Sequence, residues 1–172
     1  GLPSWGLAGS TDAKVLDAQA GSESAFSILA QGLGGLNLIH DVGYMDNGMV
    51  CSTAQLVLGK ENIGMTKRFI RGIEVNQETL ARELIENVGP GGHFLDQNHT
   101  YDHFKSELWM PSLMARSASE DWKSQGAKDL AARIQEQLED IVKNHAAPSL
   151  PGNTLTALKT IRQKGEKALA KG

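Results

Sequence analysis

Short apolar segments alternate with longer amphipathic segments in the first part of this chain. Residues 3–9 predict a short buried strand that stops at a glycine, and residues 17–33 place their apolar side chains on one helical face. The order repeats with a strand at 36–39 and a helix at about 49–70. A strand, helix, strand order predicts parallel strands joined by helical crossovers, which is the α/β class of fold.

The number of strand–helix units is small. A closed barrel of parallel strands needs eight such units and about 250 residues, whereas this chain has 172. It could therefore supply only the last few units of a barrel. The sequence begins directly at a strand without an initiating methionine, which favours a piece of a larger protein. A small independent α/β domain is the alternative.

Capping and turn residues give further local expectations. Asp46 and Asn47 are expected to cap the helix at about 49–70. Residues 76–88 predict one helix that begins at an Asn and stops at Gly-Pro, and residues 93–95 predict a short strand or a turn. Three later helices are expected from their capping residues and apolar stripes, over residues 100–109, 130–141 and 155–169.

Composition and charge exclude several classes of protein. Hydrophobic residues make up 40% of the chain and charged residues 22%, which excludes a disordered tail and a fibrous repeat. The net charge of −3 is too acidic for a nucleic-acid binder that relies on bulk electrostatics. No apolar run approaches the roughly 20 residues that span a bilayer, and no secretory signal pattern is visible. With Cys51 as the lone cysteine, we expect a cytoplasmic protein with no internal disulfide.

The charge is unevenly distributed along the chain. Residues 1–113 contain 7 Lys and Arg against 13 Asp and Glu, whereas residues 114–172 contain 10 against 7. Residues 153–172 alone have five Lys and Arg against one Glu. Such a basic amphipathic end allows a second hypothesis, in which the chain is a non-catalytic helical α/β module that binds a partner.

Polar and aromatic side chains follow both predicted strands. His40, Asp41, Tyr44 and Asp46 come directly after the second strand, and Lys14 follows the first. Parallel α/β folds bind ligands at the carboxyl ends of their strands. A protonated His40 could hold an anionic substrate group, with a backbone hydrogen bond as the alternative. A buried Lys14 could serve as a nucleophile or a base, with an exposed turn lysine as the alternative.

Other candidate sites have weaker patterns. His93, His99 and His103 lack the His-Glu-x-x-His pattern and a nearby cysteine, so ordinary polar contacts are favoured over a metal site. The glycine loop at 89–92 lacks the Gly-Lys-Ser/Thr ending of a phosphate loop and predicts a tight turn. Four aromatic side chains could form a cage for a quaternary ammonium, with the protein core as the alternative: Trp5, Tyr44, Phe94 and Trp109.

Several motifs in a fixed order resemble one family. They are LPSWGLAGSTDAK (2–14), DAQA (17–20), GLNLIHDVGY (35–44), IGM (63–65), RFIRGI (68–73) and VGPGGHFL (88–95), followed by His99, Thr100, His103, Phe104 and Trp109. Together they resemble the C-terminal part of the trimethylamine:corrinoid methyltransferase family. The resemblance covers nearly the whole chain and is less distinctive after about residue 145.

The resemblance implies a TIM-barrel enzyme of which this chain is roughly the last third. Residues 1–113 would be the last strand–helix units of the barrel, and residues 114–172 a helical extension. The implied reaction, as in methanogenesis, moves a methyl group from trimethylamine or a quaternary amine such as glycine betaine to the cobalt of a corrinoid. That cofactor sits on a separate partner protein. The full-length protein would be a homo-oligomer, and the isolated chain would be inactive because a barrel site draws groups from several strands.

The resemblance also implies roles for particular residues. The trimethylamine branch of the family carries a pyrrolysine that falls at or near Lys14. The letter at this position leaves two alternatives, an ordinary lysine, as in the quaternary-amine branch, or a pyrrolysine written as lysine. His40 would anchor the substrate, through the carboxylate of a quaternary amine such as glycine betaine. The remaining implied site residues are the His40 neighbours Asp41, Tyr44 and Asp46, with Trp5 and Phe94 beside the methyl groups.

Overall fold

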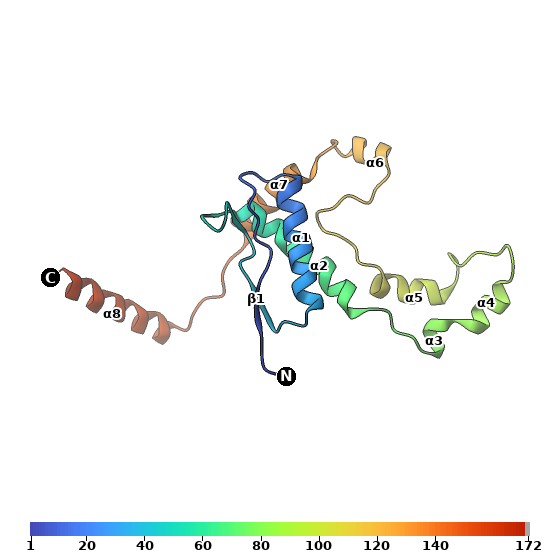
Figure 1. Cartoon of the computed structure of the whole chain (residues 1–172), viewed down its shortest axis with the longest axis horizontal. Coiled ribbons are helices and arrows are strands. Elements are labelled where there is room, and N and C mark those ends of the chain that lie inside the picture. The colour runs from blue at the N-terminus through green and yellow to red at the C-terminus, as the bar shows by residue number, and fades with distance from the viewer. Residues whose placement is uncertain (171–172) are drawn as a thin grey trace. The chain divides into compact units, whose positions relative to one another are not determined.

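The chain is a mixed α/β protein that is mostly helical, with few and short strands. The computed structural model describes residues 1–170 (Figure 1). It contains two compact units, residues 1–139 and residues 140–172, which are described separately below.

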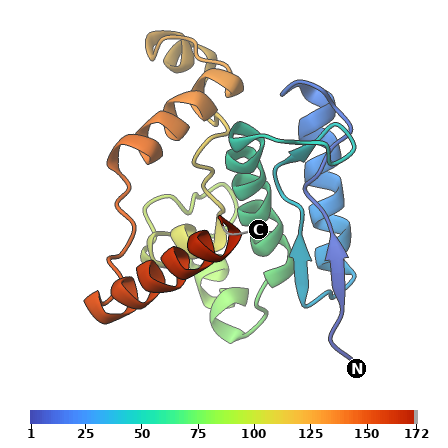
Figure 2. The ribbon, with the colours of Figure 1, turned by 90° about the vertical axis from the view of Figure 1, so that its left-hand side faces the viewer.

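The first unit begins with the predicted strand, helix, strand order. Strand β1 (Trp5–Leu7) pairs in parallel with β2 (Leu38–His40), with Leu7 opposite His40 in the register. Helix α1 (Ala18–Leu33) is the crossover between them and packs against both strands (Figure 2). The parallel pairing and the helical crossover are therefore confirmed.

Local capping explains the bounds of α1. The Asp17 side chain accepts hydrogen bonds from the backbone N–H groups of Gln19 and Ala20, at 3.0 and 3.1 Å. These bonds satisfy two of the amides that a helix start leaves without partners. The helix ends at Gly34, as expected from the Gly-Gly pair that follows it.

A short hairpin replaces the helix cap expected after the second strand. Strands β3 (Tyr44–Met45) and β4 (Val50–Cys51) pair antiparallel. Asp46 and Asn47 lie in the connecting turn with φ of 51° and 55°, a conformation that Asp and Asn tolerate better than most residues. The prediction that this pair caps the next helix was wrong, because the two residues are used to reverse the chain.

Helix α2 (Thr53–Arg71) begins after the hairpin, at Ser52. The Ser52 hydroxyl accepts a hydrogen bond from the Gln55 N–H at 3.2 Å. α2 packs along α1 (Figures 1 and 2), and buried polar side chains lie in that interface. Asn62 Nδ2 donates to Ser24 Oγ at 3.2 Å, which satisfies an amide that would otherwise be costly to bury.

Two small apolar clusters form the core of the first unit. The larger contains Val57, Leu58, Leu113 and Ile134, so it joins α2, the 112–114 loop and α7 (Leu130–Asn144). The smaller consists of Ala13, Ala20 and Met45. The smaller cluster ties the loop after β1 to α1 and to the hairpin.

The segment between α2 and α6 is helical but broken. The helix expected over 76–88 is divided into α3 (Gln77–Leu80) and α4 (Arg82–Val88), because Ala81 between them adopts φ of 49°. Residues 93–95 lie in a turn and not in a strand, so the second of the two expected alternatives is confirmed. Helices α5 (Asn98–Glu107) and α6 (Ser119–Ser124) follow.

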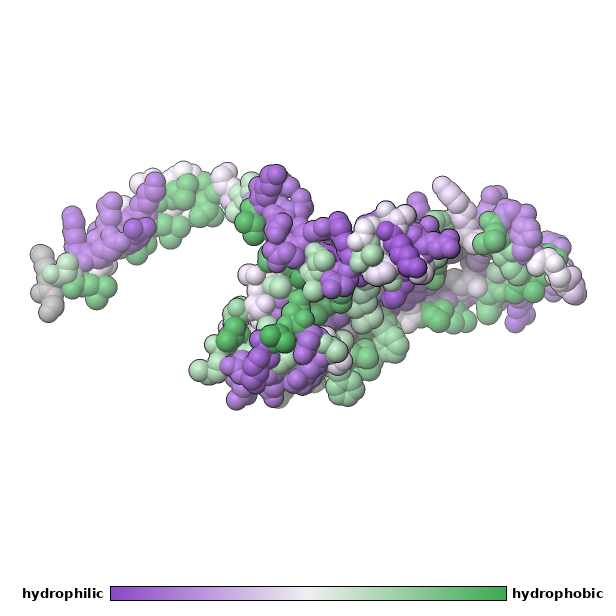
Figure 3. All heavy atoms as spheres, turned by 90° about the horizontal axis from the view of Figure 1, so that it is seen from above, coloured by the Kyte–Doolittle hydropathy of each residue, from purple (hydrophilic) through white to green (hydrophobic). Residues whose placement is uncertain are grey.

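The second unit contains α8 (Gly152–Leu169). Figure 3 shows the hydrophobic side chains of α8 gathered along one side of the helix. Leu155, Leu158, Ile161 and Leu169 are all exposed, so the predicted apolar stripe is present. Across residues 1–170, no helix combines the length and the hydropathy that crossing a bilayer requires.

Candidate functional site

The loops that follow β1 and β2 lie side by side and are connected through their backbones. The Thr11 N–H donates to the Tyr44 carbonyl at 3.0 Å, and the Asp46 N–H donates to the Ala13 carbonyl at 3.2 Å. Both loops leave the carboxyl ends of parallel strands, where α/β folds bind ligands. We call residues 11–14 and 41–46 the paired loops.

His40 is held by two neighbours at the end of β2. Its Nδ1 lies 2.6 Å from Asp41 Oδ1, so the N–H at Nδ1 donates to that carboxylate and Nε2 is the other ring nitrogen. The Trp5 ring stands edge-on to the imidazole, with centroids 4.9 Å apart and planes at 70°. Asp41 has a φ of 75°, which is strained for a residue with a side chain. The structure thus brings Trp5, His40 and Asp41 together.

Lys14 and Asp46 form a bridge across the paired loops. Lys14 Nζ lies 3.0 Å from Asp46 Oδ1 and also donates to the Asp12 carbonyl at 2.7 Å. The Lys14 side chain is 69% exposed in this chain, and Tyr44 on β3 is exposed as well. The ammonium is therefore presented at the surface of the strand-end region with a carboxylate beside it.

Val42 is wedged between two glycines and holds the second of the paired loops in place. A Cβ at Gly59 in α2 would lie 2.2 Å from Val42 Cγ1, and one at Gly9 would lie 2.9 Å from Val42 Cγ2. Gly9 also has a φ of 80°, which glycine adopts without a steric penalty. Two of the abundant glycines thus allow the site loop to approach the body of the unit.

The four aromatic side chains of the expected cage are not brought together. Trp109 packs on α2, where its Nε1 would be 3.3 Å from a Cβ at Gly64. Phe94 lies in the turn between α4 and α5 and is half exposed. Its place beside the methyl groups stays a prediction.

The histidines after the glycine loop make ordinary polar contacts. His99 Nε2 lies 2.9 Å from the Glu78 carbonyl, and His103 Nε2 lies 3.2 Å from Glu78 Oε1. His93 is instead paired with Asp96 at 3.6 Å. Within residues 1–170, no three His, Cys, Asp or Glu side chains are grouped as a metal ion would require.

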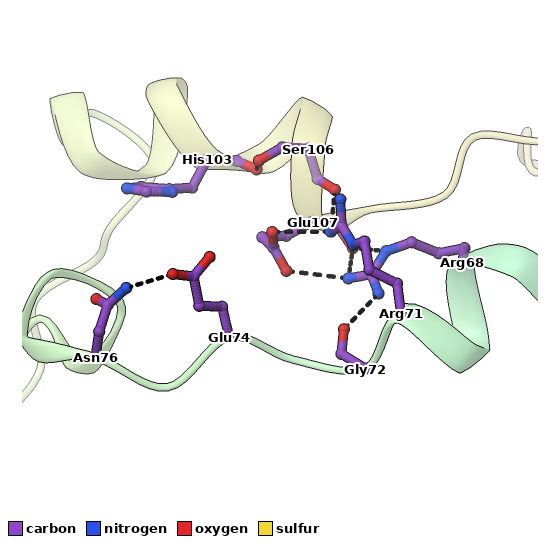
Figure 4. A network of polar contacts seen from close by, with 8 residues as sticks. All are labelled: Arg68, Arg71, Gly72, Glu74, Asn76, His103, Ser106 and Glu107. Atoms are coloured by element: carbon purple, nitrogen blue, oxygen red, sulfur yellow. Dashed lines mark hydrogen bonds and ion pairs between the residues drawn. The ribbon is translucent and has the colours of Figure 1, made fainter. Parts of the chain in front are cut away.

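An arginine–glutamate network joins the end of α2 to the end of α5 (Figure 4). Glu107 pairs with Arg68 at 3.0 Å and with Arg71 at 2.9 Å, one carboxylate oxygen to each guanidinium. Arg68 also donates to the Glu107 carbonyl and to the Gly72 carbonyl. Because Arg68 is mostly buried, this network is stronger than an exposed ion pair.

Glu107→Gln is expected to loosen α5 with a modest loss of stability, on the order of 1 kcal/mol. The amide would leave two guanidinium groups without a counter-charge. Amide hydrogen exchange across residues 98–107 should become faster, while exchange in α1 stays unchanged. The control is Glu83→Gln on α4, an exposed carboxylate that makes no ion pair within residues 1–170. Equal exchange of α5 in the two variants would contradict the tethering role.

Sequence patterns did not single out Glu23, Glu61 or Glu107. Each lies among the polar residues of a helix, where a carboxylate usually faces solvent. Glu61 had one available signal, because it falls between the apolar residues Leu58 and Met65 on α2. The structure buries it to 4% exposure.

The arrangement so far defines a class: a parallel α/β unit whose strand-end loops present a histidine, a lysine, carboxylates and aromatic side chains. Comparison with known proteins gives the family. The family described as trimethylamine methyltransferase (MTTB) matches residues 1–169. The chain belongs to this family.

Individual relatives agree with the family match. Trimethylamine methyltransferase MttB2 of Methanosarcina mazei is 38% identical over 175 residues, which cover 100% of this chain and 34% of the relative. Trimethylamine methyltransferase MttB of Desulfitobacterium hafniense is 35% identical over 165 residues, covering 96% of this chain and 33% of the relative. A glycine betaine methyltransferase of Desulfitobacterium hafniense is 34% identical over 151 residues, which cover 87% of this chain and 31% of the relative. The chain thus spans about a third of the length of these curated relatives.

Proposed function

We propose that this chain is part of an enzyme that moves a methyl group from a methylated amine to the cobalt of a corrinoid carried on a separate protein. The observation that carries the proposal is the family match over residues 1–169. Relatives named for trimethylamine and for glycine betaine support a tertiary or a quaternary amine as the methyl donor. The isolated chain would be inactive because it lacks the other loops of the site.

The proposed architecture places residues 1–113 among the last strand–helix units of a (β/α)8 barrel and residues 114–172 in a helical extension. The β1–α1–β2 unit supports it, since a barrel is built from such units. The exposed apolar side chains of β1 and β2, which include Trp5, Leu7 and Leu38, support it too. Parallel sheets are normally covered on both faces, so the remainder of the barrel is the proposed partner of this surface.

In the proposed site, His40 anchors the amine substrate through its Nε2 atom. Asp41 holds His40 in place, and Asp46 holds Lys14 in place. The remaining proposed roles are those of Trp5 and Phe94, which border the methyl groups, and of Tyr44, which is a neighbour of His40. An aromatic face attracts a cationic methylated nitrogen, which supports this assignment.

When its protein docks, the reduced corrinoid would supply the nucleophile that accepts the methyl group. The residues of this chain orient the amine so that one methyl group faces the acceptor. A quaternary nitrogen leaves as a neutral amine once its methyl group is transferred. No proton transfer is then required of the chain's side chains.

Lys14 decides between the two proposed donors. An unmodified lysine favours a quaternary amine, because a quaternary nitrogen already leaves as a neutral amine and needs no activation by a pyrrolysine. A pyrrolysine at this position favours trimethylamine. Intact and peptide mass spectrometry of the protein from its native source distinguishes them, since only pyrrolysine adds mass to the peptide that contains Lys14.

His40→Ala in the full-length enzyme is expected to lower kcat/KM for the methylated amine by about tenfold or more, the worth of one charge-assisted hydrogen bond. The assay follows methylation of the corrinoid protein at varied amine concentrations. The matched control is His93→Ala, since His93 is exposed in the turn after the glycine loop. Unchanged kinetics of His40→Ala would remove His40 from the site.

Two further parts of the proposal concern the full-length protein. We place it in the cytoplasm and expect it to be a homo-oligomer. Cell fractionation and analytical ultracentrifugation test the two statements independently of the kinetics.

A further inference from the structure

Glu23 on α1 uses both of its carboxylate oxygens, and one of them is directed at the paired loops. Oε2 accepts hydrogen bonds from the Thr11 hydroxyl at 2.5 Å and from the Asp12 N–H at 2.9 Å. Oε1 accepts from Gln19 Nε2 at 2.9 Å, one helical turn away. Gln19 therefore steadies the carboxylate, while the other two bonds reach a different segment of the chain.

The Thr11 hydroxyl relays this contact along the loop. It is 4% exposed, it donates to Glu23, and its oxygen accepts from the Ala13 N–H at 3.0 Å. Two consecutive amides, Asp12 and Ala13, are thus fixed by one carboxylate and one hydroxyl. The hydrogen bonds from Thr11, Gln19 and Asp12 hold the pKa of Glu23 below its usual value, which keeps the acceptor ionised at neutral pH.

The loop fixed in this way carries Lys14. Lys14 Nζ donates to the Asp12 carbonyl. The N–H of the same residue, Asp12, donates to Glu23. The same loop meets the other paired loop through the Asp46 N–H, which donates to Ala13. Ser27, one turn further along α1, accepts from the Gly9 N–H at 3.0 Å. One face of α1 therefore holds the segment that follows β1, from Gly9 to Ala13.

We infer that Glu23 is a positioning residue that sets the place of Lys14 and of the paired loops at the amine site. The inference rests on the proposed function for the meaning of that site. Glu23 acts through the Thr11 side chain and the Asp12 backbone. Its contacts lie outside both apolar core clusters, so its removal should change the loop without unfolding the unit.

The first test is amide hydrogen exchange on the 172-residue chain. In Glu23→Ala, exchange at Asp12, Ala13 and Asp46 should become about tenfold faster, because two charge-assisted bonds are lost. Exchange in the middle of α2 should be unchanged. Glu23→Gln keeps an acceptor and should restore part of the protection. Ser22→Ala is the control, because Ser22 is the preceding residue and its hydroxyl donates to the Ala18 carbonyl within α1.

The second test is steady-state kinetics of the full-length enzyme. Glu23→Ala should raise KM for the amine about tenfold, the worth of the bonds that hold the loop, and Glu23→Gln should recover part of it. Wild-type exchange at the three amides in Glu23→Ala overturns the inference whatever the activity. Faster exchange with an unchanged KM also overturns it, because the loop would then not serve the site. Absence of methyl transfer in the wild-type enzyme defeats the proposed function instead, and the exchange result still decides the loop contact.

Discussion

Glu61→Ala is expected to lower the free energy of unfolding by roughly 3 kcal/mol, because two backbone amides and a hydroxyl lose their buried, charged hydrogen-bond acceptor. The Glu61 carboxylate accepts from Leu113 N–H at 2.7 Å, Met114 N–H at 3.2 Å and Ser112 Oγ at 2.7 Å. Leu113 belongs to the larger core cluster with Ile134. The variant should therefore loosen α7 as well as the loop.

Chemical denaturation at neutral pH measures this effect. The control is Glu83→Ala, on the surface helix α4, which should change the midpoint little. Equal stability of the Glu61 variant and the control would show that the 112–114 loop is held by its apolar contacts alone.

The same residue predicts how stability depends on pH. Burial raises the pKa of Glu61, but the hydrogen bonds from Ser112, Leu113 and Met114 outweigh it, and the pKa lies below the usual value of 4.5. A folded-state pKa below the unfolded one contributes stability that is complete above the unfolded value and is lost as pH falls through the folded value. The denaturant concentration at the midpoint of wild-type unfolding should thus decrease as the pH is lowered below about 4.5. Glu61→Gln should remove part of that decline, and a parallel decline in both proteins would contradict the assignment.

Gly59→Ala is expected to destabilise the protein by about 1–3 kcal/mol, the usual cost of overpacking, although alanine is the better helix former by about 1 kcal/mol. The added Cβ would lie 2.2 Å from Val42 Cγ1. Valine is branched at Cβ and cannot turn this methyl group away freely. The loop that follows His40 must therefore move, so amine affinity of the full-length enzyme should fall together with the melting temperature.

A double-mutant cycle isolates this contact. Val42→Ala in the Gly59→Ala background should recover stability relative to Gly59→Ala alone, because it removes the clashing methyl group. Gly21→Ala on α1 is the matched control, since a Cβ there meets no atom within 4 Å, and it should raise the melting temperature. If Gly59→Ala stabilised the chain as Gly21→Ala does, the claim that Val42 leaves no room for a side chain at position 59 would be contradicted.

Periodicity and capping were enough to predict the elements that lead to the site. The start of α1 near Asp17 and its end at Gly34 follow from residue type and spacing, and the parallel pairing of β1 with β2 follows from the order of the elements. The position of His40 at a strand end followed from the same pattern. The ordered motifs also identified the family that the comparison found.

Other features depended on contacts that no local pattern encodes. Asp46 and Asn47 suit a helix cap and a left-handed turn equally well, and pairing of β3 with β4 selected the turn. Ala81 breaks the helix expected over 76–88 although alanine favours helix. Propensity could not have indicated that break.

The sequence by itself therefore determined the α/β order, the bounds of α1 and the residues gathered after each strand, because these depend on residue type and on spacing along the chain. Only the tertiary structure decided which carboxylates are structural. Glu61 reaches a loop more than 50 residues away, and Glu23 reaches across to the loop after β1. A buried carboxylate needs donors that the fold brings from elsewhere in the chain, and the spacing of residues along one helix does not show where those donors will be.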